Sequence, residues 1–63
     1  MKFHVILTKG NAEQNIKAFN DKDEAISFGK NYFDKMNPGD GVITVEGIEV
    51  GNPQRKVITG WHF

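Results

Sequence analysis

The stretch NDKDEAISFGKNYFDKM, residues 20–36, decides the fold, because its apolar residues follow the spacing of an amphipathic helix. They fall within about 120° of a helical wheel, with Phe28 at the flank. Asp21 followed by Glu24 matches the capping-box pattern, with aspartate as the N-cap. Pro38 and the glycines of residues 39–41 end the helix. The residues of this apolar stripe are Ala25, Ile26, Gly29, Tyr32, Phe33 and Met36.

A glycine stands at the centre of the apolar stripe. Gly29 costs about 1 kcal/mol relative to alanine inside a helix, so a close approach to a bulky side chain is the expected reason for it. Trp61, the only tryptophan of the chain, lies in the last apolar segment. The sequence therefore predicts that Trp61 fills the core beneath Gly29.

Four segments outside the helix have the alternation and the β-branched and aromatic residues of strands. They are residues 2–7, with an extension toward residue 9, residues 15–20, residues 42–50 and residues 55–63. A loop at Gly10-Asn11 joins the first two, and the turn at residues 51–54 joins the last two. In the third segment Ile43 and Val45 fall out of phase with Ile48 and Val50, which predicts a β-bulge at Glu46-Gly47.

The order strand, strand, helix, strand, strand predicts an α+β fold in a single small domain over residues 1–63. The expected architecture is a two-layer ββαββ arrangement, with one helix packed on one face of a four-stranded, mainly antiparallel sheet. We expect the two terminal strands to be neighbours in the middle of the sheet, because they carry the most apolar residues on both faces.

Size and composition narrow the possible functions. A chain of 63 residues buries only about 60% of its unfolded surface, so its stability depends on good packing, a partner or self-association. It has no cysteine, which excludes disulfides and thiolate metal sites. The apolar run near residue 5 is shorter than the roughly 7–15 residues of a signal-peptide core, and no stretch could span a membrane. We therefore expect a cytoplasmic protein that does not bind membranes.

Charge gives little support to nucleic-acid binding. Eight basic and eight acidic residues give a net charge of zero, and the basic residues are spread along the chain. Duplex-binding domains usually show a basic stripe, because neutralising phosphates supplies much of their affinity. Only Arg55 and Lys56 are adjacent, so nucleic acid is not expected as the main partner.

The sheet face opposite the helix is the candidate interaction surface, because one helix covers only one face. It can be an ordinary half-solvated face, or a contact surface for a second copy or a partner protein, since exposed apolar patches often mark interfaces. The residues assigned to it are His4, Ile6, Thr8, Lys17, Ile58 and His62, and Phe19 is a further candidate.

No catalytic or cofactor motif is present. His4 and His62 lack a neighbouring carboxylate or a second histidine at ligand spacing, and parallel terminal strands would place them at opposite ends of the sheet. Ser27 is expected on the solvent side of the helix. The acidic residues at 21–24 are explained by a helix start. We expect no enzyme activity, no cofactor and no bound metal.

Three functional hypotheses remain. The first is a non-enzymatic protein-interaction domain that works through the open sheet face, by contact with an unknown protein or with a second copy. The alternative is a weak nucleic-acid-binding module on the same face, with Lys17, Arg55 and Lys56 contacting phosphate. The third is an edge strand that adds a partner's strand by main-chain pairing.

Overall fold

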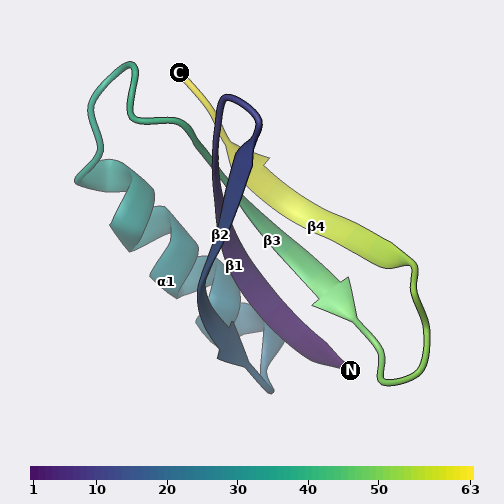
Figure 1. Ribbon diagram of the computed structural model, residues 1–63. Coiled ribbons are helices and arrows are strands. Elements are labelled where there is room, and N and C mark those ends of the chain that lie inside the picture. The colour runs from purple at the N-terminus through teal and green to yellow at the C-terminus, as the bar shows by residue number, and fades with distance from the viewer.

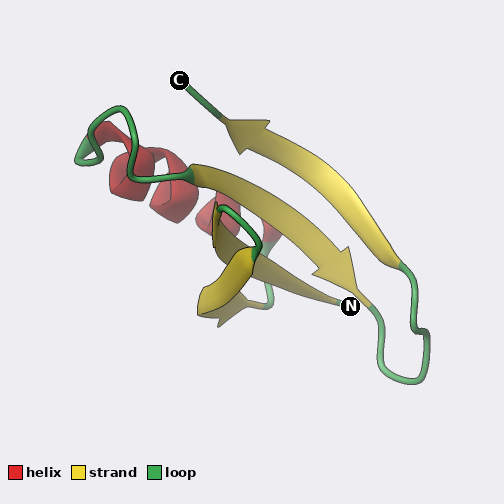
Figure 2. Cartoon of the chain, turned by 45° about the horizontal axis from the view of Figure 1, so that its top comes forward, coloured by secondary structure: helices red, strands yellow, loops and turns green.

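The computed structural model describes all residues 1–63 and shows a four-stranded antiparallel sheet with one helix on one face (Figures 1 and 2). The sheet order is β2-β1-β3-β4, so β1 and β3 are central and β2 and β4 are the edges. This arrangement confirms the α+β class and the ββαββ order. The elements are β1 (Lys2–Lys9), β2 (Ala12–Phe19), α1 (Lys22–Asp34), β3 (Val42–Ile48) and β4 (Arg55–Trp61).

The prediction that the two terminal strands are neighbours in the sheet is wrong. β3 lies between β1 and β4 and pairs with both of them in antiparallel fashion. The reason is visible in burial: Ile43 and Val45 of β3 are completely buried, whereas Arg55, Lys56 and Val57 of β4 are exposed. The apolar content of the terminal strand reflects its packing at one end, near Trp61, rather than a central position.

Helix α1 begins where the capping pattern predicts. Asp21 is the N-cap, and its side chain accepts a hydrogen bond of 2.8 Å from the backbone N–H of Asp23. The helix ends at Asp34, slightly before the predicted residue 36. The backbone N–H groups of Lys35 and Met36 donate to the carbonyls of Tyr32 and Phe33, so a tighter turn follows the last helical residue.

The apolar core lies between α1 and the sheet. Its completely buried members are Val5 of β1, Ala25 of α1, and Ile43 and Val45 of β3. The half-buried aromatic side chains of the helix and of β4 pack around them. The core has only four completely buried residues. Contacts at the sheet edges and on the second face must therefore contribute to stability as well.

The predicted contact between Gly29 and Trp61 is confirmed. A Cβ atom added to Gly29 would lie 2.8 Å from Cζ3 of Trp61 and 3.4 Å from Cγ2 of Val45. A methyl group therefore does not fit without displacement of the indole ring. Gly29 allows the helix to approach the sheet closely at this point.

Both edge strands carry a β-bulge, and both central strands are regular. Val5 and Ile6 of β1 pair with Lys17 and Asn15 of β2, which leaves Ile16 as the extra residue. On the other side Val45 and Glu46 pair with Thr59 and Val57, which leaves Ile58. The predicted bulge in the third strand is therefore wrong, since the extra residue belongs to β4.

The two bulges bend the sheet. An extra residue increases local right-handed twist and bends the strand that carries it. In Figures 1 and 2 β1 follows β3, whereas β2 turns away from the direction of β3 and β4 instead of continuing a flat sheet. The phase break in the third strand needs no bulge, because β3 ends at Ile48 and Val50 lies fully exposed in the following turn.

Candidate functional site

Register places His4, Ile6 and Thr8 together on the sheet face away from α1, as predicted. In the pairing of β1 with β3, His4 is opposite Glu46 and Ile6 is opposite Thr44. Residues directly opposite one another in an antiparallel pair share a face. The side chains of Glu46 and Thr44 therefore lie on the same face as the three predicted residues.

A polar network lies on this face. Glu46 is only 7% exposed, and Thr44 donates a hydrogen bond of 2.8 Å from Oγ1 to its Oε2. Nε of Arg55 lies 3.3 Å from Oε1 of Glu46. Nη1 of the same Arg55 lies 3.2 Å from Oε1 of Glu13. Since Glu13 belongs to β2 and Arg55 to β4, one guanidinium links the two opposite edges of the sheet.

The two carboxylates of this network stabilise the charged guanidinium. The hydrogen bond to Glu13 and the nearby charge of Glu46 raise the pKa of Arg55 above its usual value. Both carboxylates favour the protonated form by direct attraction. No buried polar side-chain atom is left without a hydrogen-bond partner, so the network satisfies the charge of Glu46 that the fold takes out of water.

Ile6, which the sequence assigned to the candidate interaction surface, is buried on this face. Ile6 lies between Asn15 of β2 and Thr44 of β3 and is only 4% exposed. On the same face, Nδ2 of Asn15 lies 2.7 Å from Nδ1 of His4. An isoleucine this well covered cannot contact a partner without rearrangement of the side chains above it.

The other predicted interaction residues lie elsewhere. Lys17 is opposite Val5, and its Nζ is 5.6 Å from the ring centroid of Phe28 on α1, so it lies on the helix side. Ile58 is half-buried and packs against the apolar core. His62 follows β4 and is exposed, with Nδ1 3.2 Å from the backbone oxygen of Phe63. The six residues therefore do not form one surface.

Phe19, the further candidate for that face, also lies on the helix side. Its ring centroid is 5.3 Å from that of Phe28. The bulge at Ile16 sets the phase of β2, and the pairing of Phe3 with Phe19 directs both rings toward α1.

Three of the four exposed large apolar side chains lie on β4 or in the segments that flank it. Val57 is 61% exposed and lies opposite Glu46, on the face away from the helix. The bulge at Ile58 places it there, whereas strict alternation with Trp61 would turn it toward the helix. Val50 protrudes from the turn before β4, and Phe63, just beyond β4, packs its ring 4.6 Å from that of Phe33. The remaining one, Met1, lies beside Gly47 of β3.

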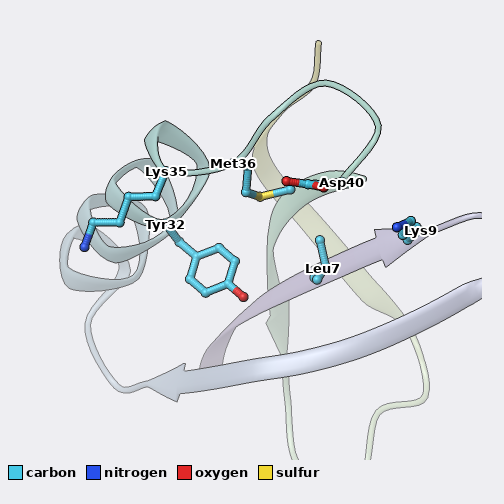
Figure 3. A pocket seen from close by; sticks show the side chains of 6 residues that line it. All are labelled: Leu7, Lys9, Tyr32, Lys35, Met36 and Asp40. Carbon is cyan, nitrogen blue, oxygen red and sulfur yellow. The ribbon is translucent and has the colours of Figure 1, made fainter.

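A pocket of about 470 Å³ lies between the end of β1, the end of α1 and the loop that leads to β3 (Figure 3). Sequence reasoning missed it, because its walls come from segments that only the fold brings together. The helical pattern had assigned two of its lining residues, Tyr32 and Met36, to the core. The lining residues are Leu7, Lys9, Tyr32, Lys35, Met36 and Asp40.

The structure contains no group of three or more histidine, aspartate or glutamate side chains placed to hold a metal ion. No helix has both the length and the apolar character that crossing a membrane requires. No protein-family model, curated protein or solved structure matches the chain. The surfaces described above must therefore carry the functional argument.

Proposed function

We propose that this chain is a small, non-enzymatic protein-interaction domain of the cytoplasm, and that its partner binds along β4 and the turn before it. The supporting observation is that three of the four exposed large apolar side chains lie on β4 or in the segments that flank it. Val57 lies on β4, Val50 lies in the turn, and Phe63 follows the strand. The other edge strand, β2, has no exposed large apolar side chain. Exposed apolar groups of this kind often mark protein contacts.

This location narrows the open face that the sequence suggested to its β4 edge, where Val57 lies opposite Glu46. Ile6 is only 4% exposed, and Lys17 lies on the helix side. A second copy docking on that face would meet mostly polar groups that already bond to one another. A protein partner or a second copy finds a better contact at β4, where the apolar side chain of Val57 is exposed.

The nucleic-acid alternative has less support. Its three proposed phosphate contacts were Lys17, Arg55 and Lys56. Arg55 is paired with two carboxylates, and Lys17 lies on the helix side, against the rings of Phe19 and Phe28. These cations do not form the continuous basic surface that phosphate binding favours.

The bulge in β4 affects the way in which a partner can bind to this edge strand. Ile58 interrupts the regular pairing of β4, and bulges at sheet edges hinder the addition of a further strand. We therefore expect side-chain contact with Val57 and its neighbours rather than main-chain pairing along the whole strand.

A photo-cross-linking amino acid at position 57 tests the proposal in the cells that produce the protein. The matched control carries the same group at Gln14, an exposed position on the opposite edge strand. We expect a discrete higher-mass adduct from position 57 and none from position 14. Identical adduct patterns from both positions, or none from position 57, would contradict the proposal. An adduct of twice the chain mass would identify the partner as a second copy.

A further inference from the structure

The pocket at the end of α1 combines an apolar lining with opposite charges. Leu7, Met36 and the ring of Tyr32 supply the apolar part, and Lys35 contributes its stem while its ammonium points away (Figure 3). Lys9 and Asp40 supply one positive and one negative group at the edge. Neither makes an ion pair within the protein. The volume of about 470 Å³ falls in the range of small-molecule sites, roughly 300–1,000 Å³.

The position of Asp40 is fixed by the loop that carries it. The backbone N–H of Asn37 donates to Oδ2 of Asp40 at 2.9 Å, and the N–H of Asp40 donates to the carbonyl of Asn37 at 3.0 Å. This doubly closed turn holds the carboxylate in place before any ligand arrives. Preorganisation of this kind lowers the entropic cost of binding.

Gly41 holds the same loop against the end of β1. Its φ of 115° is accessible mainly to glycine. A Cβ atom at this position would lie 2.5 Å from the backbone oxygen of Thr8 and 3.3 Å from Cβ of Lys9. The close approach of loop and strand brings Asp40 to the same pocket as Lys9.

We propose that this pocket binds a free α-amino acid with an apolar side chain, preferentially an aromatic one. The α-carboxylate would pair with Lys9 and the α-ammonium with Asp40, which matches the two unpaired charges. The ring would lie against Leu7, Tyr32 and Met36. Aromatic pairs and contacts between a thioether and a ring are both favourable. The partial negative charge at the C-terminal end of α1 further favours the ammonium group.

The probe for this site is L-phenylalanine, which is titrated into the ¹⁵N-labelled whole chain while ¹H–¹⁵N NMR spectra are recorded. We expect saturable shifts at the backbone amides of Lys9, Tyr32, Asp40 and Gly41, with a dissociation constant of about 1 mM or tighter. Phenethylamine lacks the carboxylate and 3-phenylpropionate lacks the ammonium group. Each should bind at least about tenfold more weakly, because one charged contact is lost.

Two variants test which charged group of the ligand contacts Lys9 and which contacts Asp40. Lys9→Gln should weaken L-phenylalanine about tenfold and leave phenethylamine unchanged. Asp40→Asn, which keeps an acceptor for the N–H of Asn37, should weaken L-phenylalanine similarly and leave 3-phenylpropionate unchanged. Lys2→Gln, at the other end of β1, and Glu49→Gln, in the turn after β3, are matched controls that should bind like the unmodified chain.

Three results would overturn the proposal. The first is the absence of saturable shifts up to about 10 mM L-phenylalanine. The second is equal binding of the amino acid and its two singly charged analogues, which would reveal a merely apolar contact. The third is unchanged affinity in both Lys9→Gln and Asp40→Asn. Because the pocket and β4 are separate surfaces, none of these results bears on the protein-interaction proposal.

Discussion

The two faces of the sheet are closed in different ways. On one face, α1 covers Val5, Ile43 and Val45 with apolar side chains. On the other face no helix is present, yet Ile6 is 4% exposed and Glu46 only 7%. There a network of polar side chains lies on a bent sheet, with Arg55 joining the two edges.

The difference shows how a short chain with a single helix can protect both faces. The bulges in β2 and β4 bend the edges, and the long side chain of Arg55 reaches Glu13 and Glu46. Covering by charges brings less stability than apolar packing, since the desolvation of Glu46 offsets much of its attraction to Arg55. The two faces should therefore respond to substitution with different magnitudes.

The largest effect is expected on the helix-covered face, from Gly29→Leu. The new side chain would collide with the indole ring of Trp61, and overpacking of this kind should lower the free energy of unfolding by about 3 kcal/mol. Urea denaturation measures it, and Ser27→Leu on the exposed side of α1 is the control. The cost should fall markedly in a chain that also carries Trp61→Ala. An undiminished cost there would mean that Trp61 is not the obstacle.

The second effect tests whether the polar face is closed. Ile6→Ala should destabilise the protein by about 2–3 kcal/mol, because Ile6 is nearly as buried as the residues under the helix. Val57→Ala, on the same face but exposed, should change the urea midpoint far less. A change of under about 0.5 kcal/mol for Ile6→Ala would show that the face is open in solution, and the comparison between the faces would then fail.

These two sites also show what the sequence could and could not predict. Periodicity, the Asp21 cap and the glycine in the helical stripe depend on neighbours along the chain, so the helix, four strands and the contact of Gly29 with Trp61 were predicted correctly. The strand order, the placement of both bulges and the side on which Lys17 lies depend on pairing between distant segments. A one-residue shift in register turns a side chain to the other face, and nothing local encodes that shift.

The candidate surfaces show the same limit. The network on the face that carries Ile6 joins Glu13 to Arg55, which are 42 residues apart in the chain. The pocket joins Lys9 of β1 to Asp40 of the loop after α1. Balanced charge in the sequence gives no sign of which opposite charges meet and which remain unpaired, because that depends on the bend of the sheet and on the turn at residues 37–40.

The third effect concerns the buried acid of the polar face. Glu46→Gln keeps the size of the side chain but removes the charge that Arg55 faces at 3.3 Å, and it should cost about 1–2 kcal/mol in the free energy of unfolding. Because Glu46 is almost completely buried, the loss should persist in high salt. Glu49→Gln, in the exposed turn that follows, is the control. A loss that disappears in 1 M salt, as it would for a surface pair, would contradict this description of Glu46.

The smallest effect is expected from Glu13→Gln, at the outer end of the same network. The pair of Glu13 and Arg55 is about half exposed on both sides, and exposed ion pairs add little to stability, so the urea midpoint should stay within measurement error. The Nε–H signal of Arg55 separates the two carboxylates by NMR, since Nε faces Glu46 and not Glu13. The chemical shift of this signal should stay nearly unchanged in Glu13→Gln and move in Glu46→Gln. The reverse pattern would mean that the contact between the two edges, and not the buried acid, holds Arg55 over the polar face.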